Sequence, residues 1–119
     1  MKPGFQPAIL LDRSVALERV GGDEELLKEI AGLFLIEYPI LLQDIRAALA
    51  RADAESLERS AHSLKGAVSN FEARLAFEAA LRLETIGRSK NLARAPSALI
   101  DLEAVFQALH PELIRLSNE

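Results

Sequence analysis

Apolar side chains recur every three or four positions along most of the chain, which is the spacing of amphipathic helices. The pattern is plain in the stretch after Asp23, whose apolar members are Leu26, Leu27, Ile30, Leu33, Phe34 and Leu41. It returns after Asn91 in Leu99, Leu102, Phe106 and Leu109. Runs of the β-branched and aromatic residues that favour strands are missing. The pattern therefore predicts an all-α fold.

Capping residues divide this pattern into five helical segments. Asp12, Asp23 and Asp53 are each placed to cap a helix start, because a carboxylate accepts hydrogen bonds from the first free N–H groups. The expected helices cover 12–20, 23–51, 53–70, 72–86 and a last segment that starts within 91–96 and ends at 109.

Glycine and proline are expected to end or bend these helices. The Gly21–Gly22 pair follows the first helix and Gly87 follows the fourth, and glycine accepts the left-handed conformation that closes many helices. Pro39 is expected to kink or divide the second helix, since proline lacks the N–H and crowds the preceding turn. Pro111 is expected to end the last helix, which leaves His110 in a loop.

The short connections between these segments favour antiparallel neighbours. We therefore expect an antiparallel up-down four-helix bundle with a short extra N-terminal helix. The 119 residues suit a single domain over 1–119, with an irregular lead-in over 1–10. A monomer is expected.

Composition excludes several classes of function. A net charge of −4 argues against general nucleic-acid binding. No apolar run approaches the length of a membrane span, and the N-terminus lacks the apolar core of a signal peptide. Cysteine is absent, so neither disulfides nor thiolate chemistry is available. A cytoplasmic location without membrane attachment is the expectation.

The third predicted helix carries the most informative polar face. Its apolar side is formed on a helical wheel by Leu57, Ala61, Leu64, Val68 and Phe71. His62 falls nearly opposite this side, so it is expected in mid-helix and exposed to solvent. An ordinary imidazole is largely neutral near neutral pH, and its free nitrogen is a nucleophile toward phosphorus. His62 is therefore the candidate reactive residue.

Three neighbours of His62 fit a phosphoryl group there. Lys65 lies three residues on, so its ammonium reaches the same patch and can offset the phosphoryl charge. Gly66 lies four residues on, and a mid-helix glycine costs about 0.5–1 kcal/mol relative to alanine. That cost is explained if another protein must approach the ring closely. Ser69, a turn further, keeps the patch small and can donate a hydrogen bond.

Glu84 is expected to lie level with His62 on the next helix. If the hairpin turn centres near Ala73, His62 lies eleven residues before it and Glu84 eleven residues after it. Glu84 would then accept a hydrogen bond from one ring nitrogen and fix the tautomer of the imidazole. A glutamate directed into solvent is the alternative.

The seven residues 61–67, AHSLKGA, resemble the signature of histidine-containing phosphotransfer (HPt) domains. The likeness extends over nearly the whole chain, with weaker matches at 22–27, 34–39 and 83–84. The family often has glycine where this chain has Glu72. If that glycine serves a left-handed backbone, Asn70 is expected to take the role here.

The resemblance implies a specific function. HPt domains are four-helix bundles that shuttle phosphoryl groups between receiver aspartates in multistep phosphorelays. They have no ATP site, so the chain is expected to be a phosphocarrier and not an enzyme. By this likeness His62 is the phosphoacceptor, Lys65 supports the phosphoryl group and Gly66 gives the receiver room. The partners would be response-regulator receiver domains, with a hybrid sensor histidine kinase upstream. No cofactor is expected on this chain, and Mg²⁺ would belong to the receiver.

Two other functions remain open from the sequence. The chain would also suit the phosphoacceptor module of a chemotaxis-type kinase, phosphorylated by a linked ATP-binding domain. Alternatively, it is an adaptor bundle whose His62 is never phosphorylated. Whether the chain is free-standing or a domain of a larger kinase is also open, and the cognate receivers cannot be named.

Overall fold

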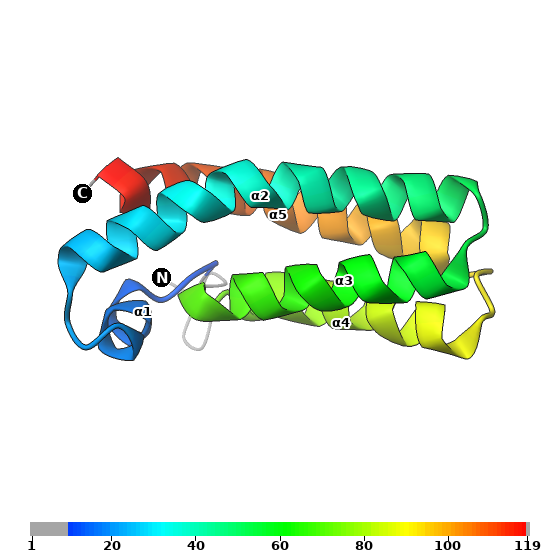
Figure 1. Ribbon diagram of the computed structural model, residues 1–119, viewed down its shortest axis with the longest axis horizontal. Helices are drawn as coiled ribbons and strands as arrows, with labels where there is room; N and C mark the ends of the chain where they lie inside the picture. The colour runs from blue at the N-terminus through cyan, green and yellow to red at the C-terminus, as the bar shows by residue number, and fades with distance from the viewer. Residues whose placement is uncertain (1–9, 119) are drawn as a thin grey trace, which may run out of the picture.

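Four long helices run alternately up and down beside one another (Figure 1). They are α2 (Glu24–Ala50), α3 (Ala54–Val68), α4 (Arg74–Ser89) and α5 (Ala95–Asn118), and a short helix, α1 (Arg13–Arg19), precedes them. The computed structural model describes residues 10–118, and no strand occurs within that range. The predicted all-α bundle with an extra N-terminal helix is confirmed. The lead-in predicted over 1–10 lies outside the described residues, except for Leu10.

The bundle encloses one core in which each helix buries a single side. Helix α3 packs between α2 and α4, and α5 closes the ring against the other sides of the same two helices. The largest fully buried side chains come from all four helices and the turn after α3: Phe71, Phe106, Ile45, Leu57, Leu64, Leu83, Leu102, Leu109, Leu113 and Val68. The side of α3 that carries Leu57 and Leu64 is thereby fixed inward, which turns its opposite side to solvent.

The predicted caps begin the first three helices. Asp12 accepts a hydrogen bond from the Val15 amide at 3.2 Å, and Asp23 accepts one from the Leu26 amide at 3.0 Å. Asp53 does the same for Ser56 at 3.1 Å and also accepts from the Ser56 hydroxyl at 2.7 Å. These bonds satisfy N–H groups that have no partner inside the helix.

The cap of α3 predicts acid sensitivity. The hydrogen bonds from Ser56, and the nearby Arg51, lower the pKa of Asp53 from 3.8 to about 2. Because the folded state holds this proton less tightly than the unfolded chain, the stabilisation is complete above about pH 4 and is lost as pH falls toward about 2. We expect Asp53→Asn to lose less unfolding free energy than the wild type between pH 4 and pH 2, measured by urea denaturation. The exposed Asp44→Asn on α2 is the control, and matching acid profiles for all three proteins would contradict this assignment.

Two prolines lie inside long helices. Helix α2 is not divided at Pro39, although Figure 1 shows its axis bending along its length. Helix α5 continues through Pro111 to Asn118, so the prediction that it ends before Pro111 is wrong. The buried stripe continues past that proline in Leu113 and Leu116, and their packing offsets the lost hydrogen bond.

His110 consequently lies within α5 and not in a loop as predicted. His110 is exposed, and its Nδ1 is hydrogen-bonded to the Tyr38 hydroxyl of α2. The Tyr38 ring stacks on Phe106 with centroids 5.0 Å apart, and burial raises the pKa of its hydroxyl. His110 therefore links α5 to α2, and α5 is not one of the two helices that pack along α3.

The turn between α3 and α4 is a short 3₁₀ segment, Ser69–Phe71, followed by a left-handed residue. That residue is Glu72, with φ of 50°, and not Asn70, so the prediction for Asn70 is wrong. Arg19 of α1 contacts both the Glu72 carboxylate and the Ser69 carbonyl, and these contacts hold the strained turn. Asn70 instead donates its side-chain amide to the Ala67 carbonyl at 3.1 Å.

Candidate functional site

His62 projects from the middle of α3 toward solvent. Its side chain is 65% exposed, whereas Ala61 and Leu64 beside it are fully buried. The placement predicted from the helical wheel is therefore confirmed. The ring is accessible to a second protein without any rearrangement of the core.

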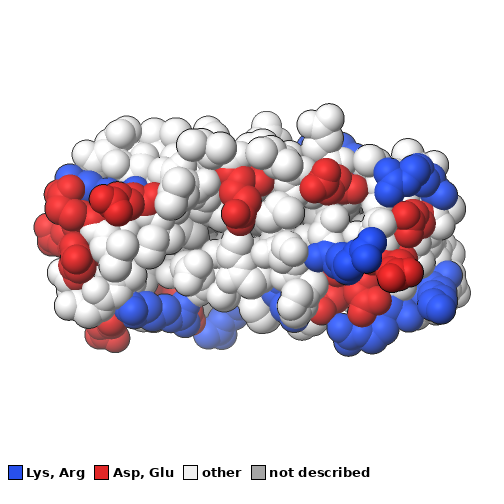
Figure 2. Space-filling view, in the orientation of Figure 1, with Lys and Arg blue, Asp and Glu red and all other residues white. Residues whose placement is uncertain are grey.

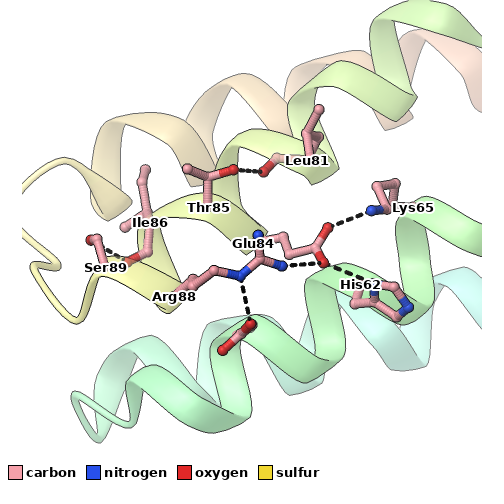
Figure 3. Close-up of polar contacts among 9 residues, drawn as sticks. His62, Lys65, Leu81, Glu84, Thr85, Ile86, Arg88 and Ser89 are labelled. Atoms are coloured by element: carbon pink, nitrogen blue, oxygen red, sulfur yellow. Dashed lines mark hydrogen bonds and ion pairs between the residues drawn. The ribbon is translucent and has the colours of Figure 1, made fainter.

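Glu84 of α4 lies directly against the ring. The Nδ1 atom of His62 is 2.8 Å from Oε2 of Glu84, as Figure 3 shows. The predicted level placement of the two residues is thus correct. The alternative of a solvated glutamate is wrong, because the Glu84 side chain is only 3% exposed. A carboxylate so deeply buried requires partners for both oxygens.

Two further cations supply those partners (Figure 3). The ammonium of Lys65 is 2.7 Å from Oε1 of Glu84, and its side chain is itself largely buried beside the Phe77 ring. The guanidinium of Arg88 donates from Nη2 to Oε2 at 3.0 Å, so it shares that oxygen with His62. Arg88 also donates from Nε to Glu58 of α3 at 3.0 Å.

These contacts keep Glu84 ionised. The hydrogen bond from Lys65 is the main reason that the pKa of Glu84 lies below its usual value, and the bond from His62 acts in the same direction. Burial opposes both by raising it. An ionised carboxylate only accepts hydrogen bonds, so Nδ1 of His62 must be the donor. In the neutral ring the lone pair then lies on Nε2, away from Glu84.

Gly87 allows α3 and α4 to approach closely enough for these contacts. It is buried, and a Cβ atom built on it would lie 2.7 Å from the Glu58 backbone nitrogen and 2.9 Å from the Ala54 carbonyl oxygen. The prediction that Gly87 ends its helix is wrong, because α4 continues to Ser89 and is closed by the left-handed Lys90. Its role is close helix packing one turn from Glu84.

Gly66 has the opposite environment. A Cβ atom built there would meet nothing within 4 Å, so the helix beside His62 presents bare backbone to solvent. The Ser69 hydroxyl donates a hydrogen bond to the Gly66 carbonyl at 2.6 Å. In this arrangement its hydrogen is already used, and it does not point to a ligand as the sequence suggested. The structure therefore brings Lys65 and Glu84 to His62, with Gly66 open beside them and Ser69 at the margin.

An open hollow of ≈ 410 Å³ adjoins the ring. Its lining is formed by Glu58, Arg59, His62, Ser63, Glu84 and Arg88. Arg88 was not identified from the sequence, although its position four residues after Glu84 is the spacing of a helical ion pair. Within residues 10–118, no group of three metal-ligating side chains comes together.

A four-helix bundle with an exposed histidine in the middle of a core-forming helix, here His62 of α3, has the architecture of histidine-phosphotransfer proteins. The Hpt domain family model matches residues 29–114, and the chain belongs to this family. It is also similar to the crystal structure of histidine-containing phosphotransfer protein B (HptB) from Pseudomonas aeruginosa PAO1. The two share 28% sequence identity and a TM-score of 0.86, over 94% of this chain and 97% of HptB.

No curated protein matches the sequence significantly. The family assignment establishes the chain as a histidine-phosphotransfer protein, one that carries a phosphoryl group in a phosphorelay. None of the helices in the described part of the chain combines the length and apolar character needed to cross a membrane.

Proposed function

We propose that this protein is a phosphorelay intermediate in which His62 accepts a phosphoryl group from a receiver aspartate and passes it to the aspartate of another receiver. The observation that carries the proposal is the exposed His62 ring, whose Nδ1 is held by the buried Glu84 carboxylate. This arrangement leaves Nε2 as the nitrogen that a partner can reach.

The proposed transfer needs only a nucleophile from this chain. The lone pair on Nε2 attacks phosphorus in line, a nitrogen–phosphorus bond forms, and the bond to the aspartate oxygen breaks. The aspartate leaves as a carboxylate with the bonding electrons. The proton on Nδ1 stays in its hydrogen bond to Glu84, which stabilises the positive charge that develops on the ring. The reverse reaction loads the next receiver.

Lys65 contributes to this chemistry through its charge. Its ammonium bonds Glu84, and the same cation lies one helical turn from the ring. A phosphoryl group on His62 adds roughly 1.5–2 negative charges, which the nearby ammonium offsets. In this proposal the metal ion that assists the transfer belongs to the receiver, and this chain brings no cofactor of its own.

The receiver is proposed to dock on the face formed by α2 and α3. Figure 2 shows much uncharged surface on this side of the molecule, interrupted in its middle by separate acidic side chains. Three large apolar side chains of α2 are more than half exposed, namely Leu33, Ile36 and Ile40. A shallow groove continues this area from Leu33 to Ala67 of α3 and to Asn70 in the turn that follows it, close to Gly66. Burial of this apolar surface would stabilise the complex.

Phosphotransfer from a panel of phosphorylated receiver domains tests the proposal. Incubation with the cognate phospho-receiver should move acid-labile phosphate to this protein within minutes, and a second receiver should then remove it. Labelling only by ATP with a kinase domain would instead favour the chemotaxis-type module. A partner that binds this surface equally well without His62, with no labelling from any source, would favour an unphosphorylated adaptor.

Gly66 provides a steric test of docking. Gly66→Phe should lower the rate of transfer by about 10- to 100-fold, because a bulky side chain holds the receiver away from Nε2 and displacements of about 1 Å are costly. Gly66→Ala, which adds one methyl group in open space, should have a much smaller effect. Stopped-flow or quenched-flow transfer from one phospho-receiver gives both rates. Equal rates for Gly66→Phe and the wild type would remove the proposed role of the bare backbone.

A further inference from the structure

Arg88 is tied into the carboxylate that holds His62. Its Nη2 and the Nδ1 of His62 both lie within hydrogen-bond distance of the same Glu84 oxygen, at 3.0 and 2.8 Å. Its Nε is simultaneously held by Glu58 at 3.0 Å. The guanidinium therefore bridges α3 and α4 at the edge of the hollow beside the ring (Figure 3).

The sharing of Glu84 Oε2 by Arg88 and His62 matters because of the other charged groups around the ring. Helix α3 contributes Glu58, Arg59 and Lys65 to the surroundings of the ring, and helix α4 contributes Glu84 and Arg88. A buried carboxylate that faced an imidazole alone would favour the charged form of the ring, in which neither nitrogen has a lone pair. Glu84 instead faces two permanent cations as well as the ring. Lys65 occupies Oε1, and Arg88 competes with His62 for Oε2.

We propose that Arg88 is a positioning residue for phosphotransfer, which acts through Glu84 to keep the His62 ring oriented and its Nε2 unprotonated. This inference rests on the proposed role of His62 and extends it. Because Arg88 shares Oε2 with the ring, it offsets part of the negative charge that His62 meets there, while the Glu84 oxygen still accepts the Nδ1 hydrogen bond. Its tether to Glu58 keeps the guanidinium at that oxygen despite its exposure.

The experiment compares pH dependence in Arg88 variants of the intact chain. The protonation of the His62 ring is followed by NMR of its carbon-bound protons, and the transfer rate is measured over the same pH range with one phospho-receiver. Arg88→Gln should shift both midpoints to higher pH by about half a unit, the size expected for loss of one partly exposed ion pair. Transfer below neutral pH should fall about threefold while the rate at high pH is retained. Arg88→Lys, which keeps the positive charge, should bring both pH midpoints most of the way back to their wild-type values.

A double-mutant cycle separates this mechanism from a direct effect of the charge on the ring. In a Glu84→Gln background, Arg88→Gln should shift the midpoint by much less than it does in the wild type. Arg82→Gln is the matched control, because Arg82 lies on the same helix and pairs with Asp101 of α5 at 2.9 Å, away from the site. It should leave both midpoints unchanged.

Two results would overturn the role of Arg88. One is an unchanged midpoint in Arg88→Gln, and the other is an equal shift with and without Glu84. Either result would leave the proposed function intact as long as the wild type still transfers phosphate. Failure of the wild type to accept phosphate from any receiver would instead remove the proposed function itself.

Discussion

Replacing His62 with glutamine should abolish acceptance of a phosphoryl group while the bundle stays folded. Glutamine has no lone-pair nitrogen that attacks phosphorus, so the expected signal in a transfer assay is at background. The side chain is 65% exposed and its only described polar partner is Glu84, so the free energy of unfolding should change little. Circular dichroism during urea denaturation measures that second expectation.

His110→Gln is the matched control for this experiment. It removes the other histidine of the chain, which lies in α5 and contacts Tyr38, away from α3. Transfer to this variant should proceed at the wild-type rate. Acid-labile phosphate on the His62→Gln protein, or its loss from the His110→Gln protein, would show that His62 is not the acceptor.

Gly87→Ala should destabilise the protein although alanine is the better helix former. The added methyl group would lie within 3 Å of the backbone of Glu58 and Ala54, and backbone atoms of a packed helix yield only if α3 moves away from α4. Overpacking of this kind typically costs about 1–3 kcal/mol, which exceeds the gain in helix propensity of about 1 kcal/mol or less. The same displacement should lengthen the contact between His62 and Glu84. Urea denaturation followed by circular dichroism measures the stability.

Gly66→Ala provides the comparison, because it makes the same chemical change at a glycine in the last turn of the adjacent helix α3. No atom lies within 4 Å of the added methyl group, so this variant should be more stable than the wild type by about 0.5–1 kcal/mol. The two substitutions should therefore change the free energy of unfolding in opposite directions. A neutral or stabilising effect of Gly87→Ala would contradict this prediction, because it would show that a methyl group fits between α3 and α4.

The sequence was sufficient for the helices whose limits are set locally. Asp12, Asp23 and Asp53 cap the helices that they were expected to cap, since the cap bond involves only residues three positions apart. It was insufficient at Pro111, because the cost of proline inside a helix is local whereas its compensation comes from Leu113 and Leu116 packing on other helices. Glycine is ambiguous for the same reason, since Gly87 serves packing between helices and not the end of its own helix.

For the site, the sequence predicted which residues meet but not how deeply they are buried. The helical wheel placed His62 outward, and counting from the turn placed Glu84 beside it. Neither method could show that Glu84 is buried, because that depends on how closely α3 and α4 approach. The role of Arg88 follows only from this burial, since a solvated glutamate would not need a shared network of cations.

The proposed role of the His62 and Glu84 pair depends most directly on which nitrogen becomes phosphorylated. Chain labelled with ¹⁵N is loaded by its phospho-receiver, and the coupling between phosphorus and the imidazole nitrogens is measured by NMR. The hydrogen bond from Nδ1 of His62 to Glu84 predicts that phosphorus is bonded to Nε2 of His62. Phosphorus on Nδ1 of His62, or on either nitrogen of His110, would contradict the account.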